Sequence, residues 1–296
     1  IRAMVGDGRE QLNPYSSIEP IELSQVTIDS SKRLITGIGE FDRVLGGGAV
    51  AGSVMLLSGE PGVGKSTLLL QTAASVAANH GPVLYVSGEE SADQIRMRAG
   101  RLGITGDRIF LLSTDDVDGI IARIDILEPS LVVIDSIQTV AAPDIPGSAG
   151  SVSQVRESAR RLTARAKTSG IPLILAGHVT KDGSIAGPRV LEHTVDVVLQ
   201  LSGDTSNSLR TLHGIKNRYG HTNEVGVFEM GAKGMLEVTD PSKSLLTDRS
   251  LRPEPAAGTA VAAVIEGTRP LIVEVQALTA PSGGQTARRV ATGIDL

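Results

Sequence analysis

The sequence predicts an α/β fold in which a mostly parallel sheet carries an antiparallel extension. The first observation is that short, nearly continuous apolar runs alternate with longer segments of helical periodicity between residues 54 and 176. Strands without polar alternation are typical of parallel sheets, whose two faces are both covered by helices. The second observation is a change after Glu192, beyond which short strand-like runs follow one another with only turn residues between them. We therefore expect parallel strands first and antiparallel strands afterwards.

The elements follow from this pattern in chain order, and glycine, proline or polar residues separate them. The parallel region is predicted as strand 54–58, helix 65–78, strand 83–87, helix 92–102, strand 109–112, helix 117–127, strand 131–134, helix 152–167 and strand 173–176. The antiparallel extension is predicted as strands 195–201, 209–215, 225–229 and 235–238.

Composition shifts divide the chain into three regions. Residues 1–30 are polar and interrupted by Asn13-Pro14 and Glu19-Pro20, so we expect a linker or arm there. The main folded region is predicted to span residues 31–250. The Pro- and Ala-rich stretch 251–258 marks a second boundary, and the last region, residues 251–296, contains two strand-like runs on either side of Gly267-Thr268. We expect the runs 260–266 and 271–278 to pair as the start of a further domain.

The bulk properties exclude several classes of protein. With 296 residues and 41% hydrophobic residues, the chain can form one large or two modest packed domains. It has no membrane-length apolar stretch and no signal sequence, so the cytoplasm is the expected compartment. The absence of cysteine excludes disulfides and thiolate zinc sites in this sequence. The net charge of −5 argues against a generally basic nucleic-acid-coating protein but permits local basic surfaces. Because the chain starts at Ile1 rather than at methionine, we expect a fragment.

A complete phosphate-binding motif, GxxxxGK[ST], lies between the first predicted strand and the first predicted helix. Its glycines allow backbone N–H groups to converge on one anion, and the helix N-terminus faces the same point. Lys65, expected to be exposed on the loop, would contact the β- and γ-phosphates, and the Ser66 hydroxyl is a suitable Mg²⁺ ligand. We therefore expect binding and hydrolysis of a nucleoside triphosphate, ATP with Mg²⁺. The motif consists of Gly59, Glu60, Pro61, Gly62, Val63, Gly64, Lys65, Ser66 and Thr67.

Three further predicted strands end in polar residues, at the edge where ligands of open α/β sheets bind. Glu89 and Glu90 follow the strand 83–87, and we expect Glu89 to be the general base that orients water towards the γ-phosphate. Glu90 is expected to be a solvated residue. Asp135 ends an apolar run in the manner of a Walker B motif and would hold a water of the Mg²⁺ bound at Ser66. His178 follows the strand 173–176 and could sense the γ-phosphate.

These motifs, in this order, resemble those of the RecA superfamily. The glycine-rich lead-in at 34–53 is similar to that of RecA, its archaeal relatives and KaiC. The resemblance to the bacterial RadA family, also called Sms, is closer, because Lys216-Asn217-Arg218-Tyr219-Gly220 looks like that family's KNRFG signature. Residues 87–91, 135–139 and 177–188 also match the family. The resemblance implies a RecA-like P-loop ATPase core followed by part of a Lon-protease-like α+β domain.

The same resemblance implies a function. Members of the family are hexameric, ATP-driven DNA motors that act on single-stranded and branched DNA in recombinational repair and promote branch migration, and a recombinase is a possible partner. Two departures matter for this chain. The four-cysteine zinc motif that usually opens family members is absent, and only the beginning of a Lon-like domain is present.

Lys216 and Arg218 lie two residues apart at the end of a predicted strand, so both should project to the same side. Neither has an acidic partner nearby in the sequence. In an oligomeric ring they could reach the γ-phosphate bound by a neighbouring subunit, in the manner of an arginine finger. The alternative is a solvated pair on an edge strand.

Two loops at positions that contact DNA in the RecA superfamily are rich in small residues. They span residues 140–151 and 178–188 and contain no aromatic residue, so we expect contacts to the DNA backbone and a strong salt dependence rather than base stacking. The cations expected to contact phosphates are Lys181, Arg189, Arg156 and Arg160.

Two other functions are compatible with parts of the sequence. A KaiC-like ATP-driven switch acting on protein partners would share the phosphate loop and the glycine-rich lead-in. An ATP-dependent protease would explain the Lon-like start, although no protease residues can be assigned. The two DNA loops and the segment 216–220 favour the DNA motor.

Overall fold

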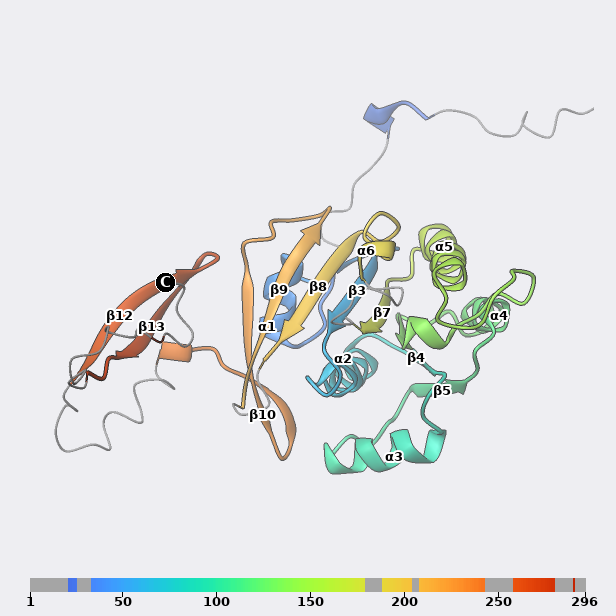
Figure 1. Ribbon diagram of the computed structural model, residues 1–296. Helices are drawn as coiled ribbons and strands as arrows, with labels where there is room; N and C mark the ends of the chain where they lie inside the picture. The colour runs from blue at the N-terminus through green and yellow to red at the C-terminus, as the bar shows by residue number, and fades with distance from the viewer. Residues whose placement is uncertain are drawn as a thin grey trace, which may run out of the picture. The chain divides into compact units, whose positions relative to one another are not determined.

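The computed structural model describes residues 21–25, 33–178, 188–203, 208–242, 258–279 and 290. The chain divides into two units, Ile1–Lys32 and Arg33–Leu296. In the first unit the described residues form one 3-10 turn, η1 (Leu23–Gln25). All other elements described below belong to the second unit, which Figure 1 shows as a sheet flanked by helices.

A nine-stranded sheet forms the centre of the second unit, in the order β11-β10-β9-β8-β3-β7-β6-β4-β5. The strands from β8 to β5 along this order are parallel, and β9, β10 and β11 are antiparallel additions. In Figure 1 the arrows of β8 and β9 point in opposite directions. The predicted α/β class with an antiparallel extension is thus confirmed. The strands are β3 (Val54–Gly59), β4 (Val83–Ser87), β5 (Ile109–Ser113), β6 (Leu131–Asp135), β7 (Leu173–His178), β8 (Val197–Ser202), β9 (Leu209–Asn217), β10 (Val225–Gly231) and β11 (Gly234–Glu237).

Two hydrophobic cores cover the two faces of this sheet. Successive side chains of β3 alternate between them: Met55 and Leu57 belong to the core under α2, whereas Val54 and Leu56 belong to the core under α4 and α5. Figure 1 shows α4 and α5 next to each other beside the sheet. The helices are α1 (Gly39–Leu45), α2 (Lys65–Asn79), α3 (Ala92–Arg101), α4 (Val117–Leu127), α5 (Val152–Ser169) and α6 (Pro188–Leu191), with a 3-10 turn, η2, at Ile137–Thr139.

Helix α1, together with the short strands β1 (Arg33–Leu34) and β2 (Ala49–Val50), was not predicted. The N-cap position of α1, Ile38, offers no side-chain cap, and the helix ends at Gly46, whose φ is +78°. Phe41, Val44 and Leu45 bury its apolar face in the α2-side core. A helix of this length without a capping residue depends on tertiary packing, so a local pattern does not reveal it.

A two-stranded hairpin, β12 (Thr259–Glu266) and β13 (Arg269–Gln276), forms around Gly267-Thr268 as the pattern predicts. The backbone N–H of Thr268 donates to the carbonyl of Asn223 at 2.9 Å, which connects the turn to the segment before β10. The assignment of 251–296 to a separate domain stays a prediction. Among the described residues, no helix is long and apolar enough to cross a membrane.

Candidate nucleotide-binding site

The phosphate-binding motif forms the loop between β3 and α2, and two of its glycines are required by geometry. Gly64 has a φ of +112°, and a Cβ placed there would lie 2.4 Å from Cε of Met230. A Cβ on Gly59 would lie 2.5 Å from the carbonyl oxygen of Leu201. A larger residue at Gly59 would therefore displace the backbone of β8, whereas at Gly64 the positive φ disfavours a side chain and the tips of Met230 and Met235 would have to move.

Lys65 is buried, with 4% of its surface exposed, and the expectation of an exposed loop lysine is therefore wrong. Its Nζ donates to the carbonyl oxygens of Gly59 at 2.9 Å and Glu60 at 3.1 Å. Burial lowers the pKa of this ammonium, an effect opposed by the negative charges of Asp135 and Glu89. The Lys65 ammonium is thus held against the backbone of its own loop.

The parallel register brings the polar strand ends to one edge of the sheet. Gly59 is paired with His178, and Ser87 with Asp135. The Ser136 hydroxyl donates to Oε1 of Glu89 at 3.0 Å, and Nε2 of His178 lies 3.9 Å from the same oxygen. Burial, and then the positive charge of Lys65, lower the pKa of His178 and favour its neutral form.

The two neighbouring carboxylates have different environments. Glu89 is exposed and faces Ser136 and His178. Glu90 instead forms an ion pair with Arg98 on α3, with Oε2 2.7 Å from Nη2, and its backbone N–H donates to the Ser87 hydroxyl. Glu90 is therefore a partner of Arg98 rather than the freely solvated residue expected from the sequence.

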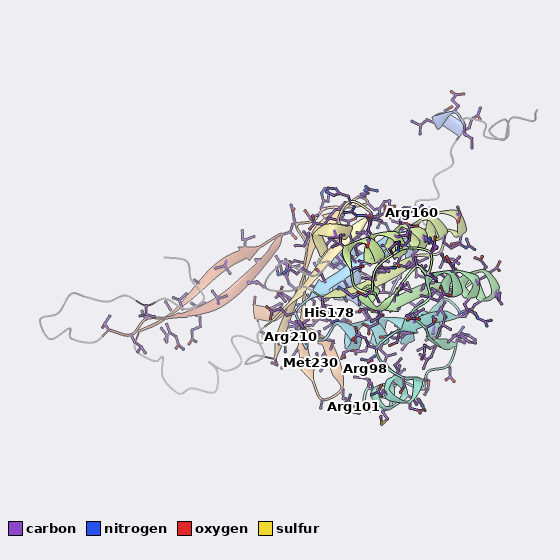
Figure 2. The ribbon with its side chains drawn as sticks, turned by 45° about the vertical axis from the view of Figure 1, so that its right-hand side comes forward. Arg98, Arg101, Arg160, His178, Arg210 and Met230 are labelled. Atoms are coloured by element: carbon purple, nitrogen blue, oxygen red, sulfur yellow. The ribbon has the colours of Figure 1, made fainter. Side chains whose placement is uncertain are left out.

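The residues at this edge fit a nucleotide with Mg²⁺. Ser66 at the start of α2 and Asp135 at the end of β6 supply hard oxygen ligands, whereas the described residues contain no group of three or more His, Cys, Asp or Glu side chains that could hold a metal alone. Such a sparse donor set is typical of Mg²⁺, which usually completes its shell with water and phosphate oxygens. A cavity of about 170 Å³ adjoins the loop and is lined by Thr67, Arg98, Arg101, Leu102, Met230, Gly231, Ala232 and Gly234. Figure 2 shows Arg98, Arg101 and Met230 in the same part of the molecule.

Lys216 and Arg218 lie where β8 begins, at the opposite end of the strands from the phosphate loop. In the ladder, Val197 at the start of β8 pairs with Asn217, whereas Leu201 near its end pairs with Gly59. Nζ of Lys216 donates to the carbonyls of Glu192 and, at 2.8 Å, Val195. Burial, and then the positive charge of Arg218, lower the pKa of Lys216.

Arg218 has an acidic partner that is distant in sequence. Its Nη1 lies 3.3 Å from Oδ1 of Asp196, and about half of its side chain is exposed. Asp196 is almost completely buried; its Oδ2 accepts from Nζ of Lys167 at 2.5 Å and from the backbone N–H of Val54 at 3.0 Å. Asp196 therefore anchors the segment 216–220 to the start of β3.

The structure describes only part of the predicted DNA-contacting surface. Lys181 lies outside the described residues, and Arg189 is placed by its backbone alone, in α6. Arg156 and Arg160 are exposed on α5, where Arg160 donates to both carboxylate oxygens of Glu157. In Figure 2, Arg160 lies well apart from Arg98 and Arg101.

The first predicted DNA loop is firmly attached to α5. Nε2 of the buried Gln154 donates to the carbonyls of Ala142, Ile145 and Gly147, and its Oε1 accepts from the backbone N–H of Ala142. Arg161 pairs with Asp144 of the loop at 2.6 Å. Sequence reasoning did not identify these residues, nor Tyr85, Arg98 and Asp196, because each acts through a partner in another element.

The chain matches the AAA domain family over residues 19–184. It is 50% identical to the DNA repair protein RadA of Bacillus subtilis over 277 residues, which are 94% of this chain and 60% of that protein. It is 48% identical to RadA of Listeria monocytogenes over 92% of this chain and 59% of the relative, and 46% identical to RadA of Streptococcus pneumoniae over 94% and 65%. The chain thus spans about 60% of the length of the curated relatives it matches.

A solved structure shares the fold. A KaiC-like protein of the hyperthermophilic archaeon Pyrococcus horikoshii superposes with a TM-score of 0.58 over 70% of this chain and 99% of that protein, at 24% identity. At this level of identity the similarity concerns the fold alone.

Proposed function

Because the chain belongs to the AAA domain family, and within it to the RadA proteins of DNA repair, we propose that it is the ATP-hydrolysing core of an oligomeric DNA motor. The observation that carries the proposal is the meeting of Lys65, Asp135 and Glu89 at one edge of the sheet. A nucleoside triphosphate bound there would place its γ-phosphate among a buried cation, a metal-binding carboxylate and an exposed carboxylate.

Each residue of this edge has a distinct role in the proposal. Lys65 neutralises the β- and γ-phosphates, and the hydroxyl of Ser66 together with Asp135 holds Mg²⁺ and its water, the ion supplying charge stabilisation during phosphoryl transfer. Glu89 accepts a proton from the attacking water, since among the described residues its carboxylate contacts the Ser136 hydroxyl and the His178 imidazole and no Lys or Arg side chain pairs with it. His178 responds to the γ-phosphate in this proposal; it lies 3.9 Å from Glu89, and its lowered pKa favours the neutral form.

Lys216 and Arg218 act on a neighbouring subunit in this proposal. They cannot reach the phosphate loop of their own chain, because the register places them at the other end of β8, roughly 13 Å away along the strand at about 3.3 Å per residue. The Arg218 side chain is about half exposed, so its guanidinium can leave Asp196 and extend outwards. A closed ring, hexameric by family resemblance, brings this edge of one subunit to the phosphate loop of the next.

The DNA contacts belong to the loops 140–151 and 178–188 in this proposal. They follow β6 and β7, so nucleotide state and DNA binding share the same strands. Arg156 and Arg160 are exposed on α5, and Lys181 and Arg189 follow β7 in the sequence. Contacts to the phosphate backbone of single-stranded or branched DNA make binding tolerant of sequence, as branch migration alongside a recombinase requires.

The test is the rate of ATP hydrolysis with and without single-stranded DNA. We expect stimulation that declines steeply between about 50 and 200 mM salt, because the contacts are to phosphates. Lys65→Ala is the matched control and should remove both basal and stimulated rates. A rate that DNA leaves unchanged at low salt would exclude the DNA motor and favour a KaiC-like switch that acts on proteins.

Mixing experiments test the trans role of Arg218. Lys65→Ala subunits still offer Arg218, and Arg218→Ala subunits still offer a complete phosphate loop. Mixed oligomers therefore contain some intact composite sites, and activity should partly return. Two inactive variants that co-assemble and regain no activity at any ratio contradict the trans role, as does full activity of Arg218→Ala alone.

A further inference from the structure

A chain of polar contacts connects Asp135 to α3. The Tyr85 hydroxyl donates to Oδ2 of Asp135 at 2.7 Å. Nη2 of Arg98 lies 3.4 Å from the Tyr85 oxygen and 2.7 Å from Oε2 of Glu90. These contacts join β6, β4 and α3 through an acidic, a neutral polar and a basic side chain in turn.

The Tyr85 hydroxyl has a specific task because its surroundings are apolar. Tyr85 is 0% exposed and belongs to the hydrophobic core on the α2 side of the sheet. A phenol buried there needs a hydrogen-bond partner, whereas phenylalanine would fill the same space without one. Asp135 is that partner, so the hydroxyl contributes an interaction with the carboxylate in addition to filling the core.

The direction of the hydrogen bond follows from the groups that make it. The Tyr85 hydroxyl is the donor, and a carboxylate oxygen of Asp135 is the acceptor. Oδ2 of Asp135 is occupied by this bond, and the rotation of the carboxylate is restricted. Among the described residues, no hydrogen bond engages the other oxygen, Oδ1, at the sheet edge where α2 begins at Lys65.

Resting on the proposed function, we propose that Tyr85 is a positioning residue for the carboxylate of Asp135, and that Arg98 and Glu90 hold Tyr85 in that role. The adjacent residues Glu89 and Glu90 then have different roles. Glu89 faces the γ-phosphate, whereas Glu90 neutralises Arg98 and stabilises the far end of the chain of contacts. Such a set of contacts around a metal-binding carboxylate is a usual means of fixing its orientation.

The first test compares Tyr85→Phe with wild type. Equilibrium binding of a fluorescent ATP analogue is measured with EDTA and across a Mg²⁺ titration, with thermal unfolding recorded in parallel. We expect unchanged binding in EDTA and an apparent Mg²⁺ dissociation constant raised roughly tenfold to a hundredfold, the usual effect of losing a hydrogen bond that orients a metal-binding carboxylate. Glu90→Gln should raise it in the same direction by a smaller factor.

Thr72→Val is the matched control, because it removes another fully buried hydroxyl, one that donates to the Leu68 carbonyl within α2. We expect it to lower thermal stability without changing the Mg²⁺ titration. If Tyr85→Phe behaves in the same way, its hydroxyl is structural only and the proposal is wrong. If wild type binds no nucleotide with or without Mg²⁺, the proposed function fails instead, which separates the two conclusions.

A double-mutant cycle tests whether Tyr85 acts through Asp135. In an Asp135→Asn background, Tyr85→Phe should have little further effect on the apparent Mg²⁺ dissociation constant, because the carboxylate that it positions is gone. Full additivity of the two changes would overturn the proposal, since independent effects require no contact between the residues.

Discussion

A buried ion pair joins the C-terminal hairpin to α1, and its removal should cost much of the protein's stability. Glu40 on α1 is 2% exposed, and its Oε2 accepts from the backbone N–H of Val227 at 2.9 Å and pairs with Nη1 of Arg269. Nη2 of Arg269, which begins β13, also donates to the carbonyls of Val238 and Thr239. Arg269→Ala would leave the Glu40 carboxylate buried without its strongest partner.

The magnitude follows from this burial. Removing one member of a buried ion pair typically costs about 3–5 kcal/mol, because an uncompensated charge stays in the interior. For a protein of this size each kcal/mol lowers Tm by about 2–4 °C, so Arg269→Ala should lower Tm by roughly 6–20 °C. Arg43 is a suitable comparison, because it lies 3.6 Å from Glu40 and its side chain is about half exposed. Arg43→Ala should cost less than about 1 kcal/mol.

The assay is thermal unfolding by calorimetry or circular dichroism at neutral pH. The double variant Glu40→Gln with Arg269→Met removes both charges, so it should recover a large part of the lost Tm. The reasoning is refuted if Arg269→Ala unfolds within about 1 °C of wild type, or if the double variant is less stable than Arg269→Ala alone. Either result would show that the hairpin is not held by a buried charge pair.

Three other predictions concern the candidate site. Lys65→Ala should abolish ATP hydrolysis with little change in Tm, because burial already disfavours the charged ammonium, as its lowered pKa indicates. Hydrolysis rate and Tm are measured on one preparation. Hydrolysis near the wild-type rate would contradict the phosphate-loop assignment. Glu89→Gln should keep nucleotide and Mg²⁺ bound while slowing hydrolysis at least tenfold, and Glu90→Gln should be milder; the reverse order of rates would mean that the two carboxylates have been assigned wrongly. His178 has a lowered pKa in the folded state, so its contribution to stability is present above about pH 6.5, the usual value, and is lost as the pH falls through the folded-state pKa. The Tm of wild type should therefore decrease more between pH 7.5 and pH 5 than the Tm of His178→Gln. If both proteins show the same decrease in a parallel melting series, His178 is not the titrating group.

Local patterns predicted most elements of the fold. Apolar runs and glycine-bounded turns placed α4 at Val117–Leu127 and β4 at Val83–Ser87, because burial on both sheet faces imposes a strong local requirement on the sequence. Several strands extend further than predicted. β6 includes Asp135 and β7 includes His178, since a strand can continue its hydrogen-bond ladder through a polar residue that no longer follows the apolar pattern.

The residues that could bind phosphate were also predictable from the sequence. The motif around Lys65 has its chemistry in consecutive residues, and a backbone that must surround an anion requires glycine at defined positions. Acidic residues at strand ends, such as Asp135 and Glu89, are recognisable for a related reason: the carboxyl ends of parallel strands meet at one edge.

The partners of these residues depended on the tertiary structure. The pairs Tyr85 with Asp135, Arg218 with Asp196 and Arg269 with Glu40 join positions that lie 50, 22 and 229 residues apart. These contacts depend on the order and register of the strands, in which β3 lies between β7 and β8. An apolar run specifies that a strand is buried, but it carries little information about which strand lies beside it. The sequence by itself therefore determined the elements and the phosphate-binding chemistry. The assembly of the strands decided the burial of Lys65, the different partners of Glu89 and Glu90, and the distance of Arg218 from its own phosphate loop.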